Sequence, residues 1–279
     1  AQVILISTEE QKGFWEQQRD CVDRIVTGDG AESAGAQLEA DDLYRDGPYD
    51  YLFMFSGSVS IFKSLKRHFP LYISGFRDNP LSAKFRTRFP RLPWGPLPCM
   101  EEDYLRLLEK QHDLKVNRAR ALAPIATAAE ARGPRCYIAP FSGLGEADRW
   151  PEARWGELVE RLDASGTLLA LERDETEARA MASRLGISCR ICPFSELTKA
   201  LSPADHLCAV DGAIAQVAAL MGVKGRVIMA SRLGSRVYRP DASLRPIFRH
   251  KPCHPCGREN CDRREHCTDD ISAEDLLGR

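Results

Sequence analysis

Apolar runs of strand length alternate with segments of helical periodicity along most of the chain. Strands that are apolar throughout are typical of a parallel sheet, because helices then cover both of its faces. In the second half of the chain, such runs lie at residues 135–142, 167–172, 187–193, 206–212 and 225–231. The alternation indicates an α/β protein with doubly wound sheets.

Two series of these elements divide the chain into domains. The first series predicts an N-terminal domain over residues 1–115, with strands at 1–7, 21–27, 49–56 and 70–76. Residues 116–133 are rich in Ala and Arg and have no strand pattern, which predicts a linker. The second series predicts a C-terminal domain over residues 134–279. The cleft between two such domains is the expected ligand site.

The segment 151–166 has the pattern of one amphipathic helix. Pro151 is expected at its first position and Gly166 at its end. Trp155, Leu158 and Val159 recur at helical spacing between them, which predicts the buried face of the helix.

Composition and charge exclude several classes of partner. The 279 residues carry a net charge of −1, so no overall field attracts nucleic acid or a membrane surface. No apolar run approaches the roughly 18 residues of a membrane-spanning helix. Scattered cysteines within apolar runs are typical of free thiols in a reducing compartment, and we expect a cytoplasmic protein. These cysteines are Cys21, Cys99, Cys136, Cys189, Cys192 and Cys208.

The loop after residue 210 joins a predicted strand to a predicted helix. Asp211 ends the strand, and the small residues Gly212 and Ala213 open the helix. A helix N-terminus at the end of a parallel strand favours an anion, through its N–H groups and its dipole. A phosphate site is one interpretation of this loop. The other is that Asp211 is simply a helix cap, as Asp often is.

A second loop of this kind follows the first strand of the same predicted sheet. Ser142, Gly143 and Gly145 would let the backbone approach a ligand closely, and Arg149 could neutralise a phosphate. An ordinary solvated loop explains the same residues. Because both loops follow strands of one parallel sheet, we expect them at the same edge.

Four cysteines lie close together near the C-terminus, with the spacing C-x2-C-x4-C-x5-C: Cys253, Cys256, Cys261 and Cys267. Four thiolates could hold a tetrahedral zinc ion. Zinc modules usually leave about a dozen residues between their ligand pairs, whereas only residues 257–260 separate the second cysteine from the third. A metal site and reduced structural thiols both remain open.

Three segments resemble glycosyltransferase family 9, the ADP-heptose:lipopolysaccharide heptosyltransferases. They are "DRWPEARWGELVERL", "ADHLCAVDGAIAQVAALMGV" and "KPCHPCGRENCDRREHCTDDISAEDL", all within residues 134–279. The segments "YDYLFMFSGSVS" and "PLYISGFR" resemble, more weakly, the middle strands of the family's first domain. The resemblance implies a GT-B architecture, in which two Rossmann-like domains face each other across a cleft.

The resemblance also implies a reaction and the residues that perform it. The reaction is the inverting transfer of a heptose or related sugar from an ADP-sugar to a lipopolysaccharide-core or similar glycan, and it needs no catalytic metal. Asp211 would contact the donor sugar or orient the acceptor. The diphosphate would meet the N–H groups of Gly212 and Ala213, with help from Ser142, Gly143 and Arg149. Some relatives hold iron with C-terminal cysteines, which adds iron to zinc as a candidate at the tail.

Glu172 and Glu175 are the candidates for binding the adenosine ribose. Glu172 ends the predicted strand at 167–172 and Glu175 follows it, and a carboxylate at the end of a strand is the usual ribose partner in Rossmann-like folds. A solvated helix start explains the two residues equally well.

The sequence departs from the family pattern in several places. Gln216 replaces a His of the donor loop and cannot carry a positive charge, and Asp148 replaces a Lys. The family's first strand and the Gly-Asp loop with its general base would precede Ala1, so we expect this chain alone to be inactive. Two alternatives to an enzyme remain. One is a non-catalytic protein that binds nucleotide sugar or glycan, and the other is a metal–cysteine interaction module.

Basic residues concentrate between Lys63 and Arg91, where eight Lys and Arg accompany one acidic residue, Asp78. The resemblance implies an anionic acceptor bound by the first domain, so we assign Arg77, Lys84 and Arg86 to acceptor binding. The alternative is a solvated face that balances the acidic first fifty residues. We expect no nucleic-acid partner, and at most peripheral contact with the inner membrane.

Overall fold

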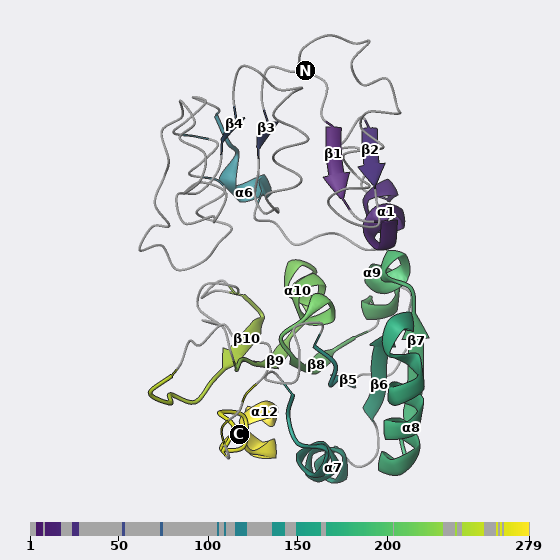
Figure 1. Cartoon of the computed structure of the whole chain (residues 1–279), viewed down its shortest axis with the longest axis vertical. Coiled ribbons are helices and arrows are strands. Elements are labelled where there is room, and N and C mark those ends of the chain that lie inside the picture. The colour runs from purple at the N-terminus through teal and green to yellow at the C-terminus, as the bar shows by residue number, and fades with distance from the viewer. Residues whose placement is uncertain are drawn as a thin grey trace. The chain divides into compact units, whose positions relative to one another are not determined.

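The computed structural model describes residues 4–7, 9–17, 24–27, 52–53, 73–74, 105, 109, 115–121, 136–142, 149–162, 166–202, 204–230, 238, 242–253, 261, 263 and 265–278. The chain divides into two compact units, Ala1–Ala121 and Leu122–Arg279 (Figure 1). The domain limits expected from the sequence, 1–115 and 134–279 around a linker at 116–133, stay a prediction.

The described part of the first unit contains two pairs of parallel strands. β1 (Ile4–Ser7) pairs with β2 (Arg24–Thr27), and β3 (Leu52–Phe53) pairs with β4 (Ile73–Ser74). Parallel pairing requires a crossover connection, which α1 supplies between β1 and β2. The described helices of this unit are α1 (Glu9–Glu16) and α6 (Arg118–Ala121).

The described part of the second unit is built on a six-stranded parallel sheet. The strands are β5 (Cys136–Ala139), β6 (Gly166–Leu171), β7 (Ser188–Cys192), β8 (His206–Val210), β9 (Gly225–Ile228) and β10 (Leu244–Ile247). Their order is β10-β9-β8-β5-β6-β7. Numbered from β5, this is the 3-2-1-4-5-6 order of Rossmann folds, read from the opposite edge. The α/β class expected from the sequence is therefore confirmed for this unit.

Helices cover both faces of this sheet (Figure 1). On one face lie α7 (Glu152–Arg161), α8 (Glu175–Leu185) and α12 (Ala273–Leu277), and on the other lie α9 (Leu197–Leu201) and α10 (Ala213–Leu220). Two 3-10 turns precede α8 and α9, namely η3 (Glu172–Asp174) and η4 (Phe194–Glu196). No helix in the described ranges has the length and apolar character needed to cross a membrane.

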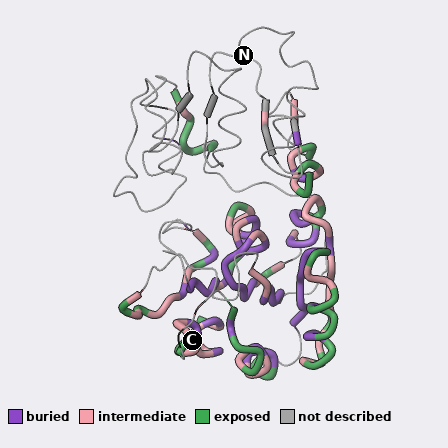
Figure 2. Tube along the Cα trace, viewed as in Figure 1, coloured by how far each residue is buried: buried purple, intermediate pink, exposed green. Residues whose placement is uncertain are grey.

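The core follows the alternation of side chains along the strands. Side chains from β5, β6, β8 and β9 pack against α7, α8 and α12, and they include Ile138, Leu168, Cys208 and Ile228. The residues before them in sequence include Tyr137, Leu207 and Val227, which lie on the other face because side chains alternate along a strand, and these are equally buried. Figure 2 shows the buried trace of the central strands in purple. Burial on both faces explains why these strands read as continuous apolar runs.

The two ends of α7 differ from the sequence expectation. The helix begins at Glu152, one residue later than expected, and Pro151 is its N-cap residue. The carbonyl oxygen of Pro151 accepts a hydrogen bond from the N–H of Arg154 at 2.9 Å. Gly166 does not end the helix, and that prediction was wrong, because Gly166 is the first residue of β6. A Cβ there would lie 3.1 Å from Cδ1 of Ile138, so glycine serves close packing between strands. The expected buried face is confirmed for Trp155, Leu158 and Val159.

The C-terminal tail packs onto the segment that precedes α7. The indole Nε1 of Trp150 donates to the backbone oxygen of Ile271 at 3.0 Å. The Thr268 hydroxyl donates to the backbone oxygen of Arg149 at 2.9 Å. Ile271 and Thr268 are both fully buried. The tail therefore fixes the end of the loop that leads into α7.

Candidate functional site

The sheet of the second unit reverses its direction of winding between β5 and β8. From β5 the chain moves outward through β6 and β7, and it then returns to β8 on the other side of β5. Ligands of open α/β sheets bind at such a switch point, in the crevice between the loops that follow the two central strands. Phe141 and Ser142 follow β5 here, and Asp211 and Gly212 follow β8. The structure therefore brings together the two loops that the sequence singled out.

Asp211 is a buried carboxylate at this switch point. The residue is 1% exposed, and its backbone N–H donates to the carbonyl oxygen of Ile228 at 2.9 Å. The Tyr238 hydroxyl donates to Oδ1 at 2.9 Å, and Nε2 of Gln216 donates to the same oxygen at 3.4 Å. A buried carboxylate needs such donors, because removing a charge from water without partners is very costly. The carboxylate is thus held in one position at the end of β8.

Helix α10 begins directly after this residue. Gly212 is the N-cap residue, and it has no side chain with which to cap the helix. Ala213 is the first helical residue, and the first turn contains no acidic side chain. The first N–H groups of a helix have no partner within the helix, and they carry partial positive charge. Gly212 therefore takes the cap position that the sequence allowed for Asp211, and this helix end suits an anion.

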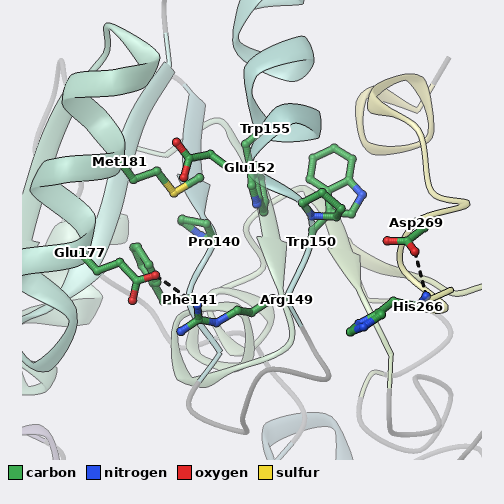
Figure 3. Close-up of a pocket in the computed structure, with 11 residues that line it drawn as sticks. Pro140, Phe141, Arg149, Trp150, Glu152, Trp155, Glu177, Met181, His266 and Asp269 are labelled. Carbon is green, nitrogen blue, oxygen red and sulfur yellow. Dashed lines mark hydrogen bonds and ion pairs between the residues drawn. The ribbon is translucent and has the colours of Figure 1, made fainter. Parts of the chain in front are cut away.

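A pocket of about 410 Å³ is lined in part by Pro140 and Phe141, which follow β5 (Figure 3). It opens between the N-terminal ends of α7 and α8, and its apolar wall includes Phe141, Trp150 and Met181. Arg149 and Glu177 form an ion pair of 3.3 Å at this pocket, and their side chains are 53% and 52% exposed. An ion pair this exposed contributes little stability, so Arg149 could exchange Glu177 for a ligand anion.

The two candidate ribose carboxylates have different surroundings. Glu172 is exposed and begins η3 directly after β6, the strand next to β5. It therefore lies at the same sheet edge as Ser142. Glu175 begins α8, and its carboxylate accepts a hydrogen bond of 2.8 Å from Nε of Arg179 on the same helix. Glu172 is the candidate placed at a strand end, whereas Glu175 is engaged within its own helix.

Two buried thiols of the sheet, Cys192 and Cys208, are poor nucleophiles. Burial raises the pKa of Cys192, at the end of β7, to about 11. A hydrogen bond with Cys136, together with burial, raises the pKa of Cys208 well above its usual range. Both thiols are therefore protonated at neutral pH, and only the thiolate is a good nucleophile. We assign these side chains to packing.

The cysteines of the C-terminal tail are only partly described. Cys253 and Cys261 are half-buried free thiols, Cys267 is half-buried, and Cys256 lies outside the described residues. Within the described ranges, no group of three or more His, Cys, Asp or Glu side chains could hold a metal ion. The described residues do not by themselves make a zinc or iron site. Metal binding by the four cysteines stays a prediction.

Other predicted residues also lie outside the described ranges, and their roles stay predictions. They are Gly143 and Asp148 in the loop before α7, and the acceptor candidates Arg77, Lys84 and Arg86.

Two residues of the site were missed in the sequence. Tyr238 donates a hydrogen bond to Asp211 from 27 positions further along the chain, and Glu177 of α8 forms an ion pair with Arg149, which precedes α7. Neither residue belongs to a recognisable motif, and both contacts arise from tertiary structure.

Comparisons with known proteins point to one fold. No protein-family model matches the sequence, and neither does any curated protein. The structure of E. coli ADP-heptose LPS heptosyltransferase II is similar, with a TM-score of 0.71 over 98% of this chain and 86% of that chain, at 13% identity. A glycosyl transferase of family 9 from Veillonella parvula has a TM-score of 0.68 over 88% of this chain and 76% of its own, at 13% identity.

A third similar structure is E. coli heptosyltransferase WaaC with ADP-2-deoxy-2-fluoro heptose. Its TM-score is 0.62 over 90% of this chain and 94% of that chain, again at 13% identity. Identity this low carries no residue-by-residue argument, so the likeness is one of fold. It confirms the resemblance read from the three sequence segments, and with it the GT-B fold class. The chain has the fold of the family 9 heptosyltransferases.

Proposed function

We propose that the chain is an inverting glycosyltransferase. It moves a heptose or related sugar from an ADP-sugar to a lipopolysaccharide-core or similar anionic glycan. The observation that carries the proposal is the buried, hydrogen-bonded Asp211 at the switch point of a fold shared with heptosyltransferases. Two similar structures, of E. coli WaaC, contain ADP or ADP-2-deoxy-2-fluoro heptose, which supports a nucleotide-sugar donor.

The donor's diphosphate lies at the N-terminus of α10 in this proposal. The N–H groups of Gly212 and Ala213 and the helix dipole stabilise its charge as it leaves. Ser142 adds a hydroxyl donor, and Glu172 accepts hydrogen bonds from the ribose. Arg149 lies in the pocket between α7 and α8, so its help to the diphosphate stays a sequence-based prediction. The helix N-terminus stabilises the leaving group, and the proposal includes no catalytic metal.

The transfer is a single displacement at the anomeric carbon. The acceptor hydroxyl oxygen attacks from the face opposite the diphosphate, so the configuration inverts. The new C–O bond forms as the bond to the diphosphate oxygen breaks, and the hydroxyl proton passes to a carboxylate base. We assign Asp211 to orienting the donor sugar and assign none of the described residues to the base.

The acceptor side of the proposal rests on the basic stretch between Lys63 and Arg91. Arg77, Lys84 and Arg86 would bind the phosphates or acidic sugars of the glycan, an assignment that comes from the sequence. An acceptor of this kind places the protein in the cytoplasm, in at most peripheral contact with the inner membrane.

Asp211→Asn tests the proposal, because it keeps the size of the side chain and removes its charge. We expect kcat for sugar transfer to fall by about 100-fold, since a mispositioned donor loses that order of rate. ADP affinity, measured by calorimetry, should change much less. Asp205→Asn is the matched control, because Asp205 is exposed and precedes β8 at the opposite edge of the sheet. Unchanged kcat in Asp211→Asn would contradict the assigned role, and a parent protein that does not bind ADP would contradict the donor class.

A non-catalytic protein that binds nucleotide sugar or glycan is the second candidate. Gln216 favours it, because Gln is neutral and its amide already donates to Asp211. The two candidates differ in one observable. An enzyme releases ADP from the ADP-sugar in the presence of acceptor glycan, whereas a binding protein leaves the donor intact at saturating occupancy.

A further inference from the structure

We propose that Tyr238 is a positioning residue for sugar transfer and that it acts by holding the Asp211 carboxylate. The inference rests on the proposed function, since it requires Asp211 to contact the donor. Its own evidence is geometric. Tyr238 is 2% exposed, and its hydroxyl donates to Oδ1 of Asp211 at 2.9 Å.

Among the described residues, Tyr238 and Gln216 donate to Oδ1 of Asp211, and Tyr238 makes the shorter of the two hydrogen bonds. A distance of 2.9 Å is within the normal range for O–H···O bonds, whereas the 3.4 Å from Nε2 of Gln216 is long for N–H···O. The tyrosine ring is rigid and buried, so its hydroxyl cannot follow a rotating carboxylate. The Gln216 side chain has more rotatable bonds and can adapt. Tyr238 therefore sets the orientation of the carboxylate.

The hydrogen bond between Tyr238 and Asp211 joins the end of β8 to the connection between β9 and β10. Asp211 closes β8, and its backbone is held by β9 through Ile228. Tyr238 belongs to the connection between β9 and β10. The side chain of Asp211 is thus fixed from a segment other than the one that fixes its backbone. Double anchoring of this kind suits a group that must meet a reacting atom within a fraction of an ångström.

Both donors described for Oδ1 of Asp211 are neutral. Tyr238 and Gln216 hold the carboxylate oxygen by hydrogen bonds, and neither of them cancels its charge. A carboxylate held in this way can stabilise the positive charge that develops on the anomeric carbon as the diphosphate leaves.

Tyr238→Phe in the full chain tests the inference, because it removes only the hydroxyl. We expect kcat to fall by about 10- to 100-fold while KM for the donor changes little. The acid limb of the pH–rate profile should move to higher pH, because the ionised carboxylate loses a donor that favours it. A purely structural hydrogen bond would lower thermal stability and leave kcat and the pH profile as in the parent, which would overturn the proposal.

Tyr137→Phe is the matched control. Tyr137 is also fully buried, and its hydroxyl accepts a hydrogen bond of 3.0 Å from Nη1 of Arg190, close to the start of β5. This variant loses a buried tyrosine hydroxyl near the amino end of β5, whereas Asp211 lies at the carboxyl end of the neighbouring strand β8. It should keep the parent's kcat and pH profile, and an equal loss of kcat in both variants would overturn the proposal.

Two further measurements keep the inference testable when folding or activity fails. Incorporation of 3-fluorotyrosine in place of Tyr238 keeps the ring and makes the hydroxyl a stronger donor, so the acid limb of the pH–rate profile should move to lower pH.

A ¹³C NMR titration of the Asp211 carboxylate needs no activity, and its midpoint should rise in Tyr238→Phe but not in Tyr137→Phe. An unmoved midpoint overturns the positioning role. A shifted midpoint in a parent that binds neither ADP nor an ADP-sugar supports the contact and overturns the proposed function instead.

Discussion

Replacing Trp150 by Phe tests how the C-terminal tail is held on the second unit. Trp150 is 3% exposed, and its Nε1 donates to the backbone oxygen of Ile271 at 3.0 Å. Its ring meets the Trp155 ring edge to face, with 4.7 Å between the centroids. Phe keeps an aromatic ring at this position, but it removes the N–H donor and part of the ring volume.

The cost follows from these contacts. Ile271 is fully buried, so its carbonyl loses a donor without gaining water, which costs about 1–3 kcal/mol. The smaller ring leaves a gap beside Trp155, which adds about 1 kcal/mol. We expect Trp150→Phe to lower the free energy of unfolding of the second unit by about 2–4 kcal/mol.

Urea unfolding followed by hydrogen exchange on peptides of each unit measures this change. Exchange in residues 265–278 should accelerate first, because these residues lose their anchor. Trp15→Phe, in α1 of the first unit, is the control and should leave the second unit unaffected. A loss below about 0.5 kcal/mol, typical of a surface substitution, with unchanged exchange in the tail would refute the reasoning.

Two further predictions concern backbone conformation and pH. At Gly225, φ is +150° and a Cβ would lie 1.9 Å from the Leu207 backbone oxygen, so Gly225→Ala should prevent β8–β9 pairing and abolish cooperative thermal unfolding of this unit. Gly186→Ala, at φ +68° with open space around its Cβ, should cost only about 1–2 kcal/mol, and equal effects of the two variants would contradict this account. Burial lowers the pKa of His206 from 6.5, so the folded chain binds this proton less readily than the unfolded chain. Stability to urea should therefore be fully present above pH 6.5 and decline as the pH falls through the folded pKa, and His206→Asn should flatten that decline.

Most of the second unit's sheet could be predicted from sequence, because its strands are buried on both faces and read as unbroken apolar runs. β10 could not, since Arg245 and Pro246 interrupt its pattern. It is an edge strand, with β9 as its neighbour, and an edge tolerates a residue that lacks an N–H donor. The role of Gly166 could not be predicted either. A glycine that follows a helical pattern resembles a helix stop, whereas its close packing against Ile138 is a tertiary contact that the sequence does not reveal.

The candidate site could be predicted only where it is local in the sequence. Asp211, Gly212 and Ala213 are adjacent, and the switch from strand to helix around them is visible in the pattern of apolar residues. Tyr238 is not visible, because a single tyrosine in a polar connection has no periodicity or spacing that marks it. The pairing of Arg149 with Glu177 is not visible either, because it joins the segment before α7 to a residue of α8, 28 positions further along the chain.

A crystal structure of this chain with ADP tests the central claim most directly. We predict that the diphosphate lies within hydrogen-bonding distance of the N–H groups of Gly212 and Ala213, with the ribose beside Glu172. ADP bound in the first unit, or bound in the second unit without contact to the N-terminus of α10, would contradict the account.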